Sequence, residues 1–432
     1  MQAYTPFIRF LLPLALTTVV QQFSLQILNG GMARMPQATE TLAAFGLAWG
    51  LVTFVSSPLW PMRSMALVLV NGRSTYHTLI RFLVLLCLLL AAIISLLTFG
   101  PISYAVIEQL HALEANLGGL VRETLFWLIP YPFVHGAIHF CTGLLLRVKR
   151  TVVTSYATLT GIGLSITAVF FLLDADFVRQ KPIWLPLLIT YIAILPEALI
   201  LLWGFGRYVW RQLAPDDEPV TYRYAARYVW PLIFVMLVQS FSRPLINLFI
   251  AREPNGADTL AVLTVVYALA LIPYNWLNDL RSLWPAFRER PLSQVRRFVV
   301  ACGMLSFSIM IGLYWTGLRT LIVADWIGLP ARLVPLATIP LMLSIFFPLV
   351  VASRAYLVGI ALTIHQTQVM TPSAPARLAM TFFFLLLLPL VGINGATRAI
   401  VALLSGFFAE TAVVWWGLQR QKKQRAFEIE PV

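Results

Sequence analysis

Residues 9–34 read RFLLPLALTTVVQQFSLQILNGGMAR, and a related stretch, RYVWPLIFVMLVQSFSRPLINLFIAR, occupies residues 227–252. With an offset of 218 positions the two stretches align without a gap, and the match continues more sparsely as far as Arg63 and Arg281. Both stretches are apolar enough to lie in lipid. The chain is therefore predicted to contain two copies of one membrane unit, a duplication from which many secondary transporters build two lobes around a central site.

The composition of the chain excludes an ordinary soluble domain. Hydrophobic residues make up 59% of it and charged residues only 11%, and the mean hydropathy is +0.81. A bilayer-spanning helix needs about 20 apolar residues, and helices are required because lipid offers the backbone no hydrogen-bond partner. The twelve predicted spans are residues 10–33, 42–70, 79–106, 122–146, 152–173, 183–206, 228–250, 259–287, 296–322, 333–361, 376–392 and 394–418.

The duplication also divides the chain into parts. An acidic stretch flanked by prolines, PDDEP at residues 215–219, is typical of a solvated linker. We predict an all-α membrane protein with twelve transmembrane helices in two pseudo-symmetric six-helix lobes, which are parallel repeats because the number of helices in each is even. The predicted parts are an amino-terminal lobe at 1–206, a cytoplasmic linker at 207–227, a carboxy-terminal lobe at 228–418 and a basic cytoplasmic tail at 419–432.

Prolines interrupt several of the predicted spans. In lipid a proline frees a backbone carbonyl and permits a kink, which can simply shape the helix or can help to open a central cavity. The prolines concerned are Pro13, Pro58, Pro61, Pro130, Pro132, Pro231, Pro273, Pro285 and Pro348.

The distribution of Lys and Arg predicts the orientation. With the amino terminus in the cytoplasm, the inside segments, in which we include Arg377, hold 19 basic residues and the outside segments hold 7. This asymmetry predicts that both termini are cytoplasmic. Much of the net charge of +13 is then an orientation signal, and no nucleic-acid-binding motif argues otherwise.

Arginines inside the predicted spans are the strongest functional signal. Each costs about 2.5–3.5 kcal/mol at membrane depth on insertion scales, so each is expected to face a hydrated cavity or a partner. The planar guanidinium group suits multivalent carboxylates and phosphates. We predict that four of them line an anion site between the lobes: Arg63, Arg243, Arg281 and Arg354.

Two alternative interpretations of these arginines stay open. They could form internal ion pairs, for which the candidate acids are Glu197, Asp279 and Glu410. An arginine near a helix end, such as Arg398, could instead extend its charge to the membrane interface. The acids are outnumbered, which favours the anion site.

Polar residues in the spans are further candidates for binding the substrate. Gln21 matches Gln239, and Asn29 matches Asn247, across the two copies. These amides could bind substrate or could hold helices together. His135 and His139 lie four residues apart on one helical face, but further ligands for a metal are not evident, so a polar pair or a cavity lining is favoured.

Several motifs resemble the progressive ankylosis protein family, which is related in fold to the multidrug and toxin extrusion (MATE) transporters. They include SRPLINLF at residues 242–249, PY and WLNDLR within 273–281, and GINGAT at 392–397. The resemblance runs from the first predicted span to the last. It implies two six-helix lobes and efflux of polyanions such as ATP, inorganic pyrophosphate or citrate-like acids.

At the positions that match the family's motifs, the resemblance places Arg243, Arg281 and Arg354 in the anion path, together with the basic position Arg63. This sequence also departs from the family pattern. Asn394, a candidate for the substrate path, stands where a histidine is expected, and Arg398 and Glu197 replace other residue types. A long acidic tail is absent, and the short loops and blunt tail suggest a bacterial inner-membrane homologue.

The predicted function is export of multivalent anions by alternating access. No enzyme signature and no phosphate-binding loop is present in the sequence, so we expect a transporter without a cofactor or a metal. Its expected partners are the lipid bilayer and a small anionic substrate, without nucleic acid, and the chain is expected to act as a monomer. The alternatives are a drug or cation antiporter, a flippase for an anionic lipid-linked precursor, and a membrane scaffold that transports nothing.

Overall fold

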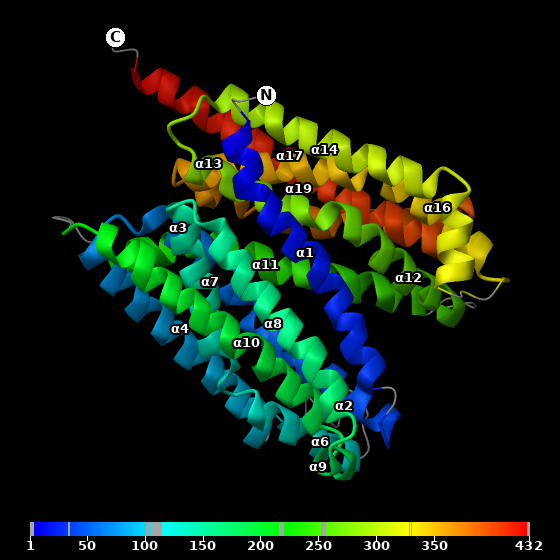
Figure 1. Ribbon diagram of the computed structural model, residues 1–432. Coiled ribbons are helices and arrows are strands. Elements are labelled where there is room, and N and C mark those ends of the chain that lie inside the picture. The colour runs from blue at the N-terminus through cyan, green and yellow to red at the C-terminus, as the bar shows by residue number, and fades with distance from the viewer. Residues whose placement is uncertain are drawn as a thin grey trace. The chain divides into compact units, whose positions relative to one another are not determined.

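The structure is a computed structural model that describes residues 4–32, 35–100, 103–104, 115–215, 220–251, 256–327, 329 and 331–429. Within these ranges every regular element is a helix (Figure 1). Nine of the described helices are long and apolar enough to cross a membrane, or ten if one bent pair counts as a single span. The predicted all-α membrane class is confirmed.

The chain forms two compact units, which we call the amino-terminal unit (residues 12–229) and the carboxy-terminal unit (residues 1–11 and 230–432). The start of α1 (Thr5–Met32) belongs to the carboxy-terminal unit, where the Phe7 ring packs edge-on against Phe287, with 5.0 Å between ring centroids. The amino-terminal unit continues with α2 (Ala38–Ser56), η1 (Ser57–Leu59), α3 (Met62–Leu69), α4 (Arg73–Phe99), α6 (Ala115–Trp127), α7 (Tyr131–Arg147), α8 (Thr151–Leu172), α9 (Asp176–Gln180), α10 (Trp184–Gly204), η3 (Phe205–Val209) and η4 (Trp210–Gln212).

The carboxy-terminal unit begins with the same order of elements. Its helices are α11 (Tyr222–Ala251), which begins in the other unit, α12 (Gly256–Tyr274), η5 (Asn275–Ser282), α13 (Leu283–Ala286), α14 (Leu292–Tyr314), α15 (Leu318–Thr320), η6 (Leu321–Trp326), α16 (Val334–Ser344), α17 (Phe347–Thr363), η7 (Thr367–Met370), α18 (Ser373–Leu387), η8 (Leu388–Val391) and α19 (Gly395–Ile429). Of these, α11, α12, η5, α13 and α14 correspond to α1, α2, η1, α3 and α4.

Four of the predicted spans are interrupted near a proline, and the span 296–322 is also broken, after α14 at Tyr314. The regions predicted as spans 42–70, 122–146, 259–287 and 333–361 are each broken into shorter helical pieces, and the pieces on either side of residues 128–130 are bent by 46°. Prolines at or beside these breaks, such as Pro58 and Pro130, remove backbone donors and explain why regular helix stops there. These four broken spans occur at matching places in the two units.

A duplicated glycine packs against a duplicated arginine in each unit. A Cβ atom added to Gly143 of α7 would overlap the carbonyl oxygen of Arg63, and one added to Gly359 of α17 would lie 3.0 Å from the carbonyl oxygen of Arg281. Only glycine permits so close an approach of two backbones. The same contact therefore fixes the backbone of each arginine in its own unit.

The two units also end their fourth-span helices in the same way. Lys149 and His365, 216 positions apart, both have φ of 59°. In each case the next residue donates its N–H to the carbonyl five positions earlier, Arg150 to Leu145 and Gln366 to Ala361. This left-handed helix cap satisfies carbonyls that the helix itself leaves free.

His365 gives this cap a dependence on pH. Burial, and then the charge of Arg288, lower the pKa of His365. As the pH falls, His365 is therefore protonated at a higher pH in the unfolded chain than in the folded protein. The free energy of unfolding should then decrease as the pH drops below about 6.5. We expect His365→Gln to remove this part of the acid sensitivity. Unfolding titrations of both proteins at pH 7.5 and 5.5 measure the difference, and parallel losses in the two proteins would contradict the expectation.

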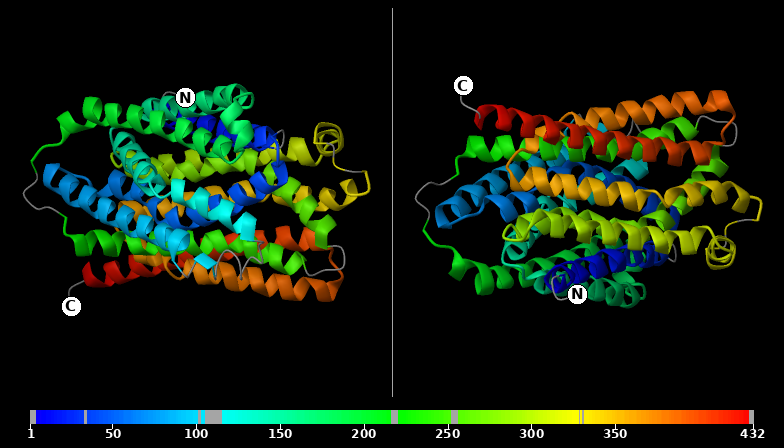
Figure 2. Two further views of the ribbon diagram at one scale, coloured as in Figure 1. Left: turned by 90° about the horizontal axis from the view of Figure 1, so that it is seen from below. Right: turned by 90° about the horizontal axis from the view of Figure 1, so that it is seen from above.

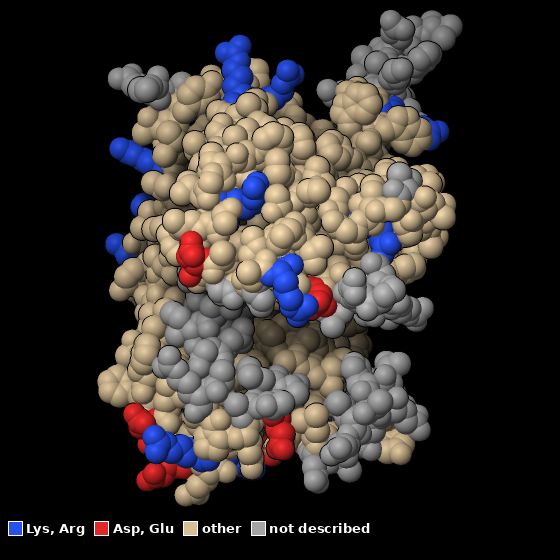
Figure 3. Space-filling view, turned by 90° about the vertical axis from the view of Figure 1, so that its right-hand side faces the viewer, with Lys and Arg blue, Asp and Glu red and all other residues tan. Residues whose placement is uncertain are grey.

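The surface of the protein suits a lipid environment. Figure 3 views the helices from the ends that lie on the right of Figure 1, and there Lys, Arg, Asp and Glu side chains stand among uncharged residues. Along the sides of the helices, by contrast, large apolar side chains are exposed. Within the carboxy-terminal unit, α14 and α17 run side by side (Figures 1 and 2), and large apolar side chains on α14, such as Val300 and Leu305, are each 56% exposed. Such exposure is expected where lipid replaces water as the surroundings.

Candidate functional site

Three arginines line one pocket inside the carboxy-terminal unit. The cavity has a volume of about 200 Å³, and α11, α12, η5, α17, α18 and α19 all contribute to its walls. Aromatic and aliphatic side chains make up the rest of the lining together with amides. The lining residues are Gln239, Ser240, Arg243, Leu271, Tyr274, Asn275, Asn278, Val351, Arg354, Arg377, Leu403 and Phe407.

Helical spacing explains how these side chains share one cavity. Gln239 and Arg243 are four residues apart on α11, so they project from the same face of that helix. Phe407 and Glu410 are three residues apart on α19 and likewise share a face. The pocket thus forms where the polar faces of these two helices meet the arginines of α17 and α18.

Glu410 is the centre of a buried polar network behind the pocket. Its side chain is only 2% exposed, and one of its oxygens lies 3.0 Å from Arg377 Nη1 and 3.2 Å from Arg354 Nη1. The other oxygen accepts a hydrogen bond of 2.6 Å from Gln239 Nε2. A carboxylate out of water requires this degree of compensation.

The Arg354 guanidinium is held from a second side as well. Its Nη2 donates a 2.7 Å hydrogen bond to Asn278 Oδ1. The guanidinium carbons of Arg354 and Arg377 lie 5.0 Å and 4.1 Å from the centre of the Phe407 ring, within the range of cation–π attraction. Both cations are therefore fixed in place before any ligand binds.

Arg243 is placed differently from the other two arginines. Its guanidinium lies 5.0 Å from the centre of the Tyr267 ring, and the side chain is exposed. Within the described ranges of the chain, no carboxylate forms an ion pair with it. Arg243 is thus the pocket cation that is most available to an incoming ligand.

The charges around the pocket do not cancel. Arg243, Arg354 and Arg377 line it, and Glu410 is the one carboxylate in the described network that contacts any of them. Three positive charges against one negative charge leave a surplus of two. A polar cavity with such a surplus can bind a multivalent anion through paired N–H donors.

The structure brings together part of the predicted site and adds to it. Gln239, Arg243, Arg354 and Glu410 come from the predicted set and meet at this pocket. The internal pairing considered for the arginines therefore applies to Arg354. Arg377 and Asn278 were missed. We counted Arg377 in a cytoplasmic segment, but it lies in α18, is 5% exposed and binds Glu410.

Other predicted residues of the carboxy-terminal unit do not line this pocket. Arg281 and Asp279 lie on η5, and each has interactions of its own. Asn247 is exposed on α11. The Asn394 side-chain oxygen accepts the backbone N–H of Thr397 at 2.8 Å and so caps the start of α19, while Arg398 is buried, at 6% exposure.

The predicted residues of the amino-terminal unit form separate features. His135 and His139 face each other with 3.0 Å between their Nε2 atoms, and the Tyr131 ring stacks on His135. Glu197 accepts a 2.7 Å hydrogen bond from Thr158. Gln21 is exposed on α1, and Arg63, the second residue of α3, is half-buried. The side chain of Asn29 lies outside the described residues. Among the described residues, no cluster could hold a metal ion.

Comparison with known proteins identifies the fold and the family. The family described as Progressive ankylosis protein (ANKH) matches residues 1–316. A MATE structure in the bent conformation has a TM-score of 0.73 at 16% identity, covering 98% of this chain and 97% of that one. A MOP superfamily transporter from Pyrococcus furiosus, described as having a binding pocket of reverse polarity, gives 0.70 at 14% identity, covering 96% and 95%. A eukaryotic MATE transporter gives 0.69 at 14% identity, covering 98% and 99%.

Proposed function

The chain belongs to the progressive ankylosis protein family, and from this premise we propose that it exports multivalent anions by alternating access. Its family and fold are those of membrane transporters and not of enzymes. The substrates proposed are inorganic pyrophosphate, citrate-like acids and ATP. The transporting lobes of this proposal are residues 1–206 and 228–418, with both termini in the cytoplasm and the chain acting as a monomer in the inner membrane.

One observation carries the proposal: three arginines line a cavity whose polar network contains one carboxylate. Cations in excess of their carboxylate partners are costly in a membrane protein. This surplus, two largely buried guanidinium groups and the exposed Arg243 against one carboxylate, is therefore favourable only if a mobile anion or water occupies the cavity part of the time. Arg354 and Arg377 are held by Glu410 and Phe407. They need little rearrangement to receive a ligand, which lowers the cost of binding.

The size of the cavity supports a small polyanion. Pockets for drug-sized ligands occupy about 300–1,000 Å³, and this cavity has about 200 Å³. Pyrophosphate or a tricarboxylate suits this volume better than a whole nucleotide does. For ATP, the cavity would receive the phosphate chain and leave the nucleoside outside it.

The membrane potential supplies a driving force in the proposed direction. Moving one charge through 100 mV is worth about 2.3 kcal/mol. An anion with several negative charges that leaves a cell with a negative interior gains this amount for each charge. Export therefore does not require a coupled ion.

Efflux from vesicles tests the proposal directly. Purified protein reconstituted into liposomes that contain labelled pyrophosphate, citrate or ATP should release these anions faster than protein-free liposomes, and faster when the potential favours anion exit. A labelled organic cation should not be released. Cation release without anion release would contradict anion export and would favour the antiporter, for which an excess of acids is expected.

A further inference from the structure

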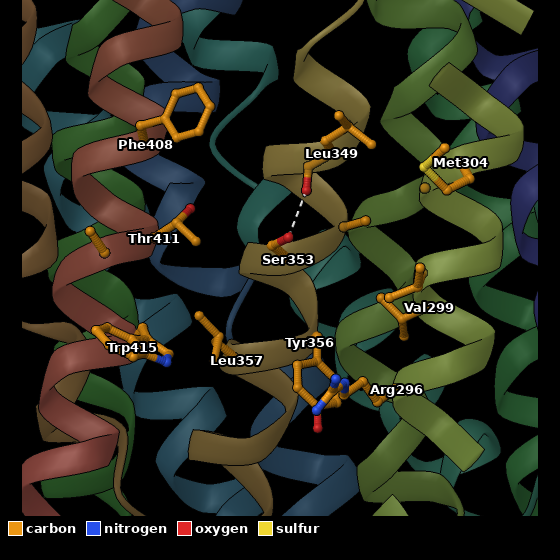
Figure 4. Close-up of a pocket in the computed structure, with 14 residues that line it drawn as sticks. Arg296, Val299, Met304, Leu349, Ser353, Tyr356, Leu357, Phe408, Thr411 and Trp415 are labelled. Carbon is orange, nitrogen blue, oxygen red and sulfur yellow. Dashed lines mark hydrogen bonds between the residues drawn. The ribbon is translucent and has the colours of Figure 1, made fainter. Parts of the chain in front are cut away.

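A second cavity lies on the carboxy-terminal unit, apart from the arginine pocket. It is an open groove of about 560 Å³, with walls formed by α14 and α19, and α17 lies between them (Figure 4). Val299 and Met304 project from α14, and Phe408 and Trp415 from α19. No residue of the arginine pocket lines it.

Small residues explain why the groove is not filled by side chains. A Cβ atom added to Gly303 of α14 would lie 3.1 Å from the Cβ atom of Ala352, so these two helices approach closely at the floor. Ser353 on α17 and Ala412 on α19 also line the groove, and their small side chains fill little of it. The Ser353 hydroxyl donates a 2.7 Å hydrogen bond to the Leu349 carbonyl (Figure 4), so the floor presents a satisfied polar group to whatever lies in the groove.

The walls of the groove are exposed and apolar. Val300 is 56% exposed, Met304 47%, Phe408 53% and Trp415 54%. From Leu349 to Tyr356 the floor extends about 10 Å along α17, at 1.5 Å per residue. A narrow apolar groove of this kind on a membrane protein suits an extended hydrocarbon chain.

One end of the groove carries a cation beside a hydroxyl group. Arg296, near the start of α14, and Tyr356 of α17 lie together at this end (Figure 4), and the Arg296 charge acts on the Tyr356 hydroxyl. Arg296 is the one charged residue among those that line the groove. A guanidinium and a phenol together supply several donors for a phosphate group.

We propose that this groove binds one anionic phospholipid, with an acyl chain between α14 and α19 and its phosphate on Arg296 and Tyr356. The charge at one end and the apolar length beyond it match the two parts of such a lipid. The acyl chain gains little from leaving a bilayer that is as apolar as the groove. Selectivity for an anionic lipid therefore comes from its net negative charge beside Arg296, because a choline cation on the same phosphate would repel the guanidinium group. The site is independent of the transported anion.

Native mass spectrometry of the purified protein tests the site. The wild type is incubated with phosphatidylglycerol or with phosphatidylcholine of the same acyl chains, and retained lipid is counted. We expect one phosphatidylglycerol to be retained in preference to phosphatidylcholine. Because one charge-assisted contact is lost, Arg296→Gln should weaken phosphatidylglycerol retention by about tenfold. The matched control Arg297→Gln changes an exposed neighbour that does not line the groove, and it should behave as the wild type.

Filling the groove tests the place of the acyl chain. Ala412→Trp adds bulk to an exposed lining position and should reduce retention of both lipids, while thermal unfolding shows whether this variant remains folded. Equal retention by wild type and Arg296→Gln would overturn the proposal. It would also be overturned if inorganic phosphate gave as much Arg296-dependent stabilisation as the lipid does, measured as the difference between wild type and Arg296→Gln. A second copy of the chain covering the groove, seen as a dimer that Ala412→Trp converts to a monomer, would overturn it as well.

Discussion

Replacing Arg243 with glutamine is expected to lower pyrophosphate efflux from reconstituted vesicles by at least about tenfold. The variant removes a hydrogen bond from a charged donor to the anion, and such a bond contributes about 1.5–3 kcal/mol, which is about a tenfold change or more. Within the described chain Arg243 forms no ion pair, and it packs on the Tyr267 ring. The fold should therefore persist while transport is lost.

Two further variants show whether the effect belongs to the pocket. Arg243→Lys keeps the charge but loses the paired donors, so its efflux should lie between those of the wild type and Arg243→Gln. Arg332→Gln removes an exposed cation that pairs with Asp258 and does not line the pocket, and it should leave efflux unchanged. Equal efflux in Arg243→Gln and Arg332→Gln, at equal protein incorporation, would remove Arg243 from the anion path.

Replacing Glu410 with alanine is expected to lower the free energy of unfolding by about 3–5 kcal/mol, the usual cost of breaking a buried ion pair. Glu410 is 2% exposed and binds Arg354, Arg377 and Gln239. Without it, Arg377, which is 5% exposed, keeps its charge in an apolar environment. Denaturant unfolding of the protein in detergent micelles measures the loss.

A double-mutant cycle separates this ion pair from a simple loss of packing. In the variant that combines Glu410→Ala with Arg377→Met, no uncompensated charge remains at Arg377. Its free energy of unfolding should therefore exceed the value expected from adding the two single losses by more than about 0.5 kcal/mol. If the losses simply add, the contact between Glu410 and Arg377 does not stabilise the protein.

The repeat was sufficient to predict much of the fold. The aligned stretches at residues 9–34 and 227–252 predicted two related units, and the prolines anticipated the breaks in four spans. Apolar length reveals a span because lipid excludes unpaired backbone groups. The same signal does not locate the ends of a helix, so α4 begins at Arg73 and not at residue 79.

The pocket depends on contacts that the sequence does not reveal. Arg354 and Glu410 were recognised as a buried cation and a candidate partner, because charges in apolar stretches are conspicuous. Arg377 was missed since it follows the polar segment at residues 371–373 and resembles a residue at a helix end. Its position depends on α18 packing against α19, and the hydrogen bond from Gln239 to Glu410 joins residues that are 171 positions apart.

Equilibrium binding of labelled pyrophosphate to the purified protein tests the central claim, that the arginine pocket receives a multivalent anion. The wild type should bind pyrophosphate saturably, and more weakly as the salt concentration rises, because free ions screen and compete with the phosphate. The variant that combines Arg243→Gln with Arg354→Gln should bind at least about a hundredfold more weakly. Equal affinities of the two proteins, or no saturable binding of pyrophosphate, citrate or ATP by the wild type, would contradict the claim.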